Sequence, residues 1–250
     1  MQLKINHHSF KSISSTNTWA LQNLNTFDTQ ALTVITAKEQ SSGRGRQNRT
    51  WSSPGDTNLY ATYCLFVDSN DSIKSICNIP QILAISCAET LSDLALNVQL
   101  KWPNDILVDE KKVAGILCET KRIDNKIFVA TGIGLNINMT DTILHTLDKP
   151  ATSILAETGV THPIESIELL LREKFIENIQ LFFKSGFSTF HKKFNARLYH
   201  PPEVRFHDNR SVVTGKILQL NSDGTLEFQE SGGRIRTLHY GELESIKEST

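Results

Sequence analysis

The sequence lacks several features that would place it in a familiar class at once. No apolar run reaches the length of a membrane span, and the first ten residues, MQLKINHHSF, contain neither a long apolar segment nor a small-residue cleavage site. The charges nearly cancel, with 26 Lys and Arg against 27 Asp and Glu. We therefore expect no export, no membrane partner and no nucleic-acid partner, and any phosphate binding must be local.

Cysteine is scarce and unpaired in the sequence. The four cysteines, Cys64, Cys77, Cys87 and Cys118, form no C-x-x-C pair, and each has apolar neighbours. This pattern predicts free, buried thiols and a reducing, cytoplasmic environment.

Several catalytic and metal-binding motifs are missing as well. The chain has no G-x-x-x-x-G-K-[ST] motif, no G-x-S-x-G motif and no G-x-G-x-x-G that opens a helix after a strand. The histidines show no metal-ligand spacing, so we expect no metal site built by the protein, and His7-His8 is expected to be an exposed terminal pair.

What is present is an ordinary globular composition, with 39% hydrophobic residues over 250 residues. That length allows one large domain with a small appendage. Hydroxyl residues at Ser15 and Thr16 should cap a short helix, and β-branched and aromatic residues predict strands over 31–39 and 58–67. Helical spacing of apolar residues predicts a buried helix over 79–96.

The rest of the chain adds a meander, helices and a small β region. Residues 98–139 hold apolar stretches separated by short polar turns, which favours antiparallel strands. Helical spacing returns over 164–198, with a break at Gly186, and short strand candidates follow Pro201-Pro202. We predict an α+β fold: a mixed, largely antiparallel sheet with flanking helices over residues 1–200, and a small β-barrel over 201–250.

An arginine- and glycine-rich loop, SSGRGRQNRTW, occupies residues 41–51 between two predicted strands. Glycine lets backbone N–H groups approach an anion, and an arginine fork matches phosphate or carboxylate oxygens. The loop is therefore either a cradle for an anionic ligand or a mobile surface loop.

Two further stretches could carry chemistry. In KWPND, Lys101 lies near a strand end beside a proline, which would fix its ammonium group, although a solvated lysine before a turn fits as well. In VATGIGLNINM, residues 129–139, apolar residues alternate with small or polar ones, so one face of the strand has no large apolar side chain. Either a ligand or a crossing backbone could need that space.

Taken in order, SSTNT, EQSSGRGRQNRTW, NLY, KWPNDILVDEKKVAGILCE and GIGLNIN resemble the biotin protein ligase family, the biotin–[acetyl-CoA-carboxylase] ligases. The resemblance runs along most of residues 13–140. It implies a catalytic domain related to lipoate ligases and class II aminoacyl-tRNA synthetases, followed by an SH3-like barrel. It also implies two half-reactions: biotin and ATP give biotinyl-5′-AMP, and a lysine of a biotin carboxyl carrier protein then takes the biotinyl group.

The resemblance also implies roles for particular residues. The catalytic cations would be Lys101, Arg44 and Arg46, with Mg²⁺ carried in on the nucleotide and no metal held by the protein. The residues implied at the biotin are Ser15, Thr16, Asn17, Gln40, Gly43, Arg44, Gly45, Arg46, Lys101, Gly115 and Gly134. Those implied at the nucleotide are Arg46, Trp51, Lys101 and Asn136, with Trp51 packed on the adenine.

The sequence departs from the family pattern in its arginine loop, where Gln47-Asn48 replaces an arginine and a glycine of many members. Because SSTNT begins by residue 14, we expect no N-terminal DNA-binding domain and no repressor function. The rival interpretations are a lipoate or octanoate ligase or transferase and a non-catalytic phosphate-binding module. The sequence leaves open whether the protein is a monomer or a homodimer, and which carrier it modifies.

Overall fold

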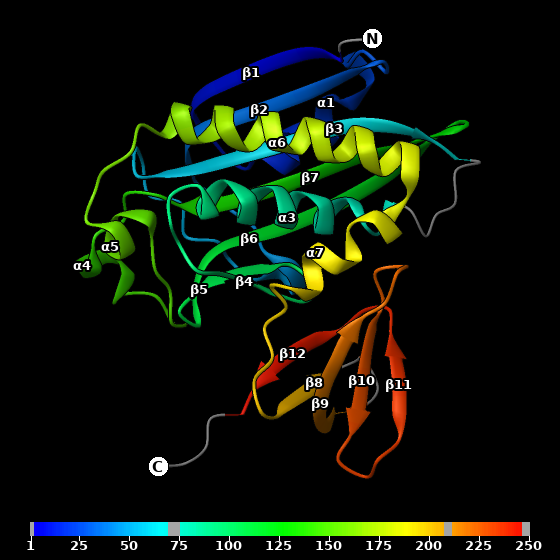
Figure 1. Cartoon of the computed structure of the whole chain (residues 1–250). Helices are drawn as coiled ribbons and strands as arrows, with labels where there is room; N and C mark the ends of the chain where they lie inside the picture. The colour runs from blue at the N-terminus through cyan, green and yellow to red at the C-terminus, as the bar shows by residue number, and fades with distance from the viewer. Residues whose placement is uncertain (1–2, 70–75, 208–211, 247–250) are drawn as a thin grey trace.

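A computed structural model describes residues 3–69, 76–207 and 212–246 and contains two sheets (Figure 1). The larger sheet has the strand order β1-β2-β3-β7-β6-β5-β4, in which β1–β2 is parallel and the other pairs are antiparallel. Its strands are β1 (Lys4–Ile13), β2 (Ala31–Gln40), β3 (Asn58–Asp68), β4 (Val98–Lys101), β5 (Asp105–Val108), β6 (Lys111–Ile123) and β7 (Lys126–Asn136). The predicted mixed, largely antiparallel sheet is therefore confirmed.

Helices cover both faces of this sheet. The helices are α1 (Thr16–Asn23), α3 (Ile79–Ser92), α4 (Asp141–Leu144), α5 (Ile154–Thr158), α6 (Ile164–Ser185) and α7 (His191–Asn195). Figure 1 shows α3 and α6 lying across one face, where their apolar sides complete the main core. Helix α1 packs on the opposite face around Ala20, Leu24 and Phe27. None of the helices in the described residues is both long and apolar enough to cross a membrane.

Local signals in the sequence account for the ends of these helices. Ser15 is the N-cap of α1, and its hydroxyl accepts a hydrogen bond from the Thr18 N–H. Gly186 ends α6 with φ 74°, a backbone angle that glycine adopts without a Cβ penalty.

The N-terminal residues differ from the prediction of an exposed terminal pair. They form the edge strand β1, in which His7 is exposed and the His8 ring packs 5.0 Å from the Trp19 ring. The strand was missed because an edge strand that is mostly polar on both faces has no apolar alternation.

The cysteine prediction is only partly correct. Cys64 and Cys87 are buried, and burial raises the pKa of the Cys87 thiol to about 12. Cys118 is half-buried, and Cys77, just before α3, is exposed. The apolar residues around Cys77 in the sequence point into the core from a turn, so the cysteine between them faces outward.

The second sheet follows Pro201-Pro202 and is antiparallel, with the order β11-β10-β9-β8-β12. Its strands are β8 (Val204–His207), β9 (Val212–Leu220), β10 (Leu226–Glu230), β11 (Ile235–Leu238) and β12 (Glu242–Ser245). The expected small β region is present, although no pairing between β11 and β12 closes it into a barrel in the parts of the chain described. The division into domains at residue 200 stays a prediction, since one apolar core runs through both sheets.

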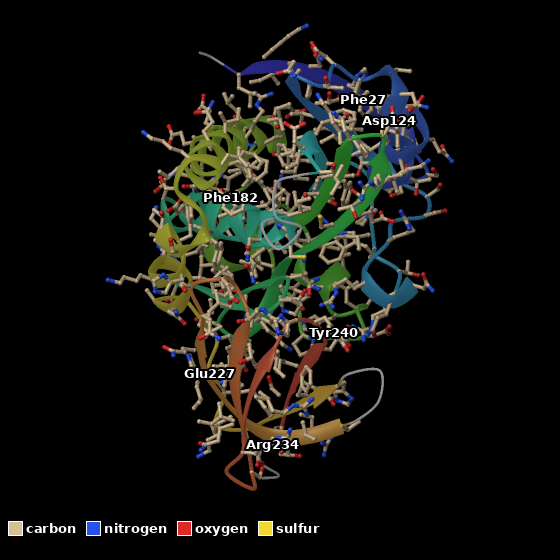
Figure 2. All side chains as sticks on the ribbon, turned by 90° about the vertical axis from the view of Figure 1, so that its right-hand side faces the viewer. Phe27, Asp124, Phe182, Glu227, Arg234 and Tyr240 are labelled. Atoms are coloured by element: carbon tan, nitrogen blue, oxygen red, sulfur yellow. The ribbon has the colours of Figure 1, made fainter. Side chains whose placement is uncertain are left out.

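Buried amides join the small sheet to the start of α3. The Asn78 amide donates to the Asp223 carbonyl at 3.0 Å, and the Gln81 amide donates to the Gly224 carbonyl at 2.8 Å. Gly224 has φ 84°, and a Cβ on it would overlap the Asn78 amide, so this turn requires glycine. Figure 2 shows Tyr240 where the small sheet approaches the large one and Arg234 at the far end.

Candidate active site

A cleft of about 1820 Å³ opens on the α1 side of the large sheet and extends to the small sheet. Most of the residues expected at the ligands line it. They are Ser15, Thr16, Asn17, Gln40, Arg44, Gly45, Arg46, Trp51, Lys101, Gly115, Gly134 and Asn136. Gly43 is buried and does not belong to this lining. Its carbonyl oxygen accepts a hydrogen bond from the Trp51 N–H at 2.9 Å. A Cβ there would lie 2.5 Å from the Trp51 carbonyl oxygen, so the close crossing of the loop explains this glycine.

The polar end of the cleft is an ordered hydrogen-bond network. The Gln40 Oε1 accepts from the Thr16 backbone N–H at 2.9 Å, and the Gln40 Nε2 donates to the Ser53 hydroxyl at 3.0 Å. Because an amide N–H can only donate, these bonds fix which way the Gln40 amide points. One of its hydrogens has no partner among the residues described.

Asn17 is placed in the cleft wall, but its polar atoms are already used. Its Nδ2 donates both hydrogens, to the Leu117 carbonyl at 3.1 Å and to Glu119 Oε2 at 2.9 Å. Its side chain also fills the space above Gly132, where a Cβ would overlap it. The glycine-rich strand face is therefore covered here by the protein's own side chain.

The arginine loop holds its charges apart through different partners. Arg44 forms an ion pair with Glu119 at 2.7 Å. Arg46 donates to Asn104 Oδ1 and to the Gly241 carbonyl of the small sheet, each at 3.1 Å. Arg49 pairs with Glu242 of the small sheet. The loop thus bridges the two sheets.

Two residues in this loop adopt backbone angles that favour glycine. Gln47 has φ 55° and Asn48 has φ 58°, the region that costs an ordinary side chain about 1 kcal/mol. Gln47-Asn48, where the sequence departs from the family pattern, are therefore the two residues of this loop with positive φ angles outside glycine.

The glycine slot, formed by the facing residues Gly115 of β6 and Gly134 of β7, is occupied by Trp51. A Cβ on Gly134 would overlap the indole, and one on Gly115 would lie 3.1 Å from it. The indole Nε1 is buried and has no hydrogen-bond partner in the described parts of the chain. The resemblance implies that biotin lies between the two glycines and that Trp51 packs on the adenine. In this structure, Trp51 itself occupies the space between the two glycines.

Two lysines flank the slot, and sequence reasoning found only one. Burial lowers the pKa of Lys101, and the nearby Asp105 carboxylate opposes that shift. Lys112 was missed: its ammonium pairs with Asp105 at 2.6 Å and lies 5.2 Å from the Trp51 ring centroid. In a regular strand, residues three apart face opposite sides, so the sequence contained no signal for this placement; a register shift in the β5–β6 pairing brings Lys112 to within 2.9 Å of a Cβ built on Gly115.

Asn136 lies in the cleft wall with its amide engaged, because Nδ2 donates to the Thr152 carbonyl at 3.0 Å. The described residues contain no group of three or more His, Cys, Asp or Glu side chains that could hold a metal ion. The cleft therefore combines a neutral polar end, a glycine slot and the cations Arg44, Arg46, Lys101 and Lys112.

An α+β fold with a cleft of this composition defines a protein that can bring two anionic groups together. Residues 9–138 match the Biotin/lipoate A/B protein ligase family, and the chain belongs to that family.

Relatives share both sequence and fold with the chain. The bifunctional ligase/repressor BirA of Salmonella typhimurium is 26% identical over 226 residues, covering 86% of this chain and 69% of the relative. The biotin–[acetyl-CoA-carboxylase] ligase of Paracoccus denitrificans is 33% identical over 141 residues, covering 54% of this chain and 58% of that one. The biotin protein ligase from Aquifex aeolicus, solved in complex with biotin and ATP, superposes with a TM-score of 0.78 at 27% identity, covering 96% of this chain and 97% of that one.

Proposed function

We propose that the chain is an ATP-dependent biotin protein ligase. A biotin carboxylate oxygen attacks the α-phosphorus of ATP, the bond to the bridging oxygen breaks, and pyrophosphate leaves. The amine of a carrier lysine then attacks the biotinyl carbonyl carbon, loses a proton and releases AMP. The similarity to named biotin ligases supports biotin over lipoate as the acid.

The observation that carries this function is that Arg44, Arg46 and Lys101 line the same cleft as the neutral polar end. A carboxylate and a triphosphate repel each other, and fixed positive charges offset that repulsion most strongly as charge builds in the transition state. A mobile surface loop or a simple phosphate-binding module requires no half-buried lysine at the base of the cleft.

The family resemblance implies the roles of individual residues, and their places in one cleft support these roles. Ser15, Thr16 and Gln40 would bind the ureido ring, and Arg44, Arg46 and Lys101 would bind the carboxylate and the α-phosphate. Mg²⁺ would arrive on the nucleotide, where it neutralises phosphate charge. Biotin would take the slot between Gly115 and Gly134.

Trp51 must then leave that slot and pack against the adenine. The mixed anhydride is prone to hydrolysis, so the arginine loop would close over it and exclude water until the carrier arrives.

The partner in this reaction would be a biotin carboxyl carrier protein, and we infer a cytoplasmic reaction from the unpaired cysteines of the sequence. The prediction that the enzyme is a monomer or a homodimer stays as the sequence left it.

Biotin-dependent exchange of labelled pyrophosphate into ATP tests the first half-reaction directly. We expect saturable exchange with biotin and little or none with lipoate. Exchange with lipoate alone would favour the lipoate ligase interpretation, and no exchange with either acid would favour the binding module.

A further inference from the structure

Thr62 of β3 is a fully buried threonine behind the polar end of the cleft. It has 0% exposed surface and is absent from the cleft lining. Its hydroxyl oxygen lies 2.8 Å from the Thr16 hydroxyl and 2.7 Å from Asn17 Oδ1. It therefore contacts two residues of the cleft wall without reaching the cleft itself.

The hydrogens of Asn17 determine the direction of these bonds. Its two amide hydrogens go to the Leu117 carbonyl and the Glu119 carboxylate, which are acceptors only. Turning the amide over would place Oδ1 against both acceptors, so Oδ1 must face Thr62. A carbonyl oxygen cannot donate, and the single hydroxyl hydrogen of Thr62 therefore goes to Asn17.

The Thr62 oxygen is then left as an acceptor for the Thr16 hydroxyl. Thr16 can direct its hydrogen either to Thr62 or to Gln40 Oε1, which is 3.2 Å away. Both choices keep Gln40 Oε1 turned toward the Thr16 N–H and leave one Gln40 hydrogen for the cleft. Thr62 therefore has one fixed bond, to Asn17 and through it to Glu119 and Arg44, and one contact with the Thr16 hydroxyl, whose single hydrogen serves either Thr62 or Gln40.

We infer that Thr62 is a positioning residue for biotin: its hydroxyl fixes the orientation of the Asn17 amide and contacts the Thr16 hydroxyl from behind, so that the wall of the polar end keeps a shape that fits a cyclic urea. This inference rests on the proposed function. A urea ring presents one acceptor oxygen and two N–H donors, so an unordered set of amides and hydroxyls would match it only part of the time. The residues proposed for the nucleotide, Arg46, Trp51, Lys101 and Asn136, have no side-chain hydrogen bond to Thr62 among the described residues.

Thr62→Val removes the hydroxyl at nearly constant volume and leaves Asn17 Oδ1 without a donor. We expect the KM for biotin in pyrophosphate exchange to rise about ten-fold, as for loss of one buried hydrogen bond, with the KM for ATP within about two-fold of the parent. Calorimetric titration of biotin without ATP should show the same loss of affinity.

Thr62→Ser restores the hydroxyl and should return the biotin KM to within about two-fold of the parent, while Thr62→Cys, a weak donor, should lie between. Thr131→Val is the matched control, because Thr131 is also fully buried in the sheet and its hydroxyl contacts only the Cys118 sulfur, at 3.5 Å, among the described residues. It should leave both KM values unchanged.

Three results would overturn the inference: an unchanged biotin KM in Thr62→Val, an equal rise in the KM for ATP, or an equal effect of Thr131→Val. If Thr62→Val does not fold, the biotin affinities of the parent, Thr62→Ser and Thr62→Cys proteins test the inference, and we expect them to fall in that order. Equal affinities in the three proteins overturn the inference. The absence of exchange by the parent protein would instead refute the proposed function, so the two failures are distinguishable.

Discussion

Lys101 illustrates how the tertiary structure changes a side chain that looks ordinary in the sequence. Its ammonium is half-buried, and the loss of hydration lowers its pKa, with partial compensation from Asp105. A lysine placed in this way carries its positive charge with less solvent screening, which strengthens its attraction for phosphate and carboxylate oxygens. It also loses its proton at lower pH than an exposed lysine.

We therefore predict an alkaline decline in kcat/KM for biotin activation that begins below the ordinary lysine value of 10.5. The sign follows from the lowered pKa: protonated Lys101 is the active form, and it is depleted as the pH rises through that value. In Lys101→Arg the decline should move upward by more than about one pH unit, because a guanidinium stays charged. A decline at the same pH in both proteins would assign it to another group.

Asn17 and Asn136 show the opposite outcome at the same scale. Sequence reasoning placed both at ligands, and both lie in the cleft wall, yet Asn17 already donates both of its amide hydrogens to other parts of the protein and Asn136 donates one. Residue type and motif cannot reveal this, because the acceptors lie as far away in the chain as Leu117 is from Asn17.

At the scale of elements, the arginine loop and the strands β6 and β7 form one unit. The glycines leave a groove in the sheet surface, and the loop returns Trp51 into it. Burial of an indole is favourable, but its unpartnered Nε1 costs about 1–3 kcal/mol. The position of the indole in the slot therefore combines favourable burial of its rings with an unfavourable burial of its N–H group.

If biotin and ATP occupy the cleft, Trp51 should change its environment. We predict a change in tryptophan fluorescence on adding both ligands, and its loss in Trp51→Phe. Trp19, which lies outside the cleft lining, remains in that variant as the internal control, whereas Trp102 lines the cleft and would account for a small residual signal. A full-sized change in Trp51→Phe would show that another tryptophan reports binding, and that Trp51 does not leave the slot.

At the scale of the whole molecule, the small sheet is a fixed wall of the cleft. Asn78 and Gln81 attach one of its turns to α3, and its opposite side supplies the Gly241 carbonyl and Glu242 to the arginine loop. These contacts give the small sheet a role that the sequence did not assign. It restrains the loop when the cleft is empty.

Weakening this restraint should expose the loop to proteolysis. The Arg49–Glu242 pair is partly exposed, with side-chain exposures of 51% and 21%, so its contribution is at most about 1 kcal/mol. We predict that Glu242→Gln speeds tryptic cleavage at residues 43–49 by about two- to five-fold without changing the unfolding temperature. Biotin plus ATP should block cleavage in both proteins.

Glu244→Gln provides the control, because Glu244 lies in the same strand but pairs with His207 and Arg205 inside the small sheet. Equal acceleration in both variants would mean that the loop responds to the charge of the sheet rather than to its contact with Glu242.

The sequence by itself determined the α+β class, the order of β2 to β7 with α3, the helical region of α6 and α7, and most of the residues at the cleft, but it did not predict the short helices α4 and α5. These follow from local properties: side-chain periodicity, capping residues, glycine angles and a run of motifs in fixed order. It missed β1, Lys112 and the exposure of Cys77, where the local pattern is weak or misleading.

Only the tertiary structure decided which of these groups remain free to act. It placed Trp51 in the glycine slot, saturated Asn17, lowered the pKa of Lys101 and joined the arginine loop to the small sheet. Each outcome depends on partners far apart in the chain, as Arg46 and Gly241 are, and on the loss of water around them. Hydrogen bonding and hydration of this kind exist only after the chain has folded.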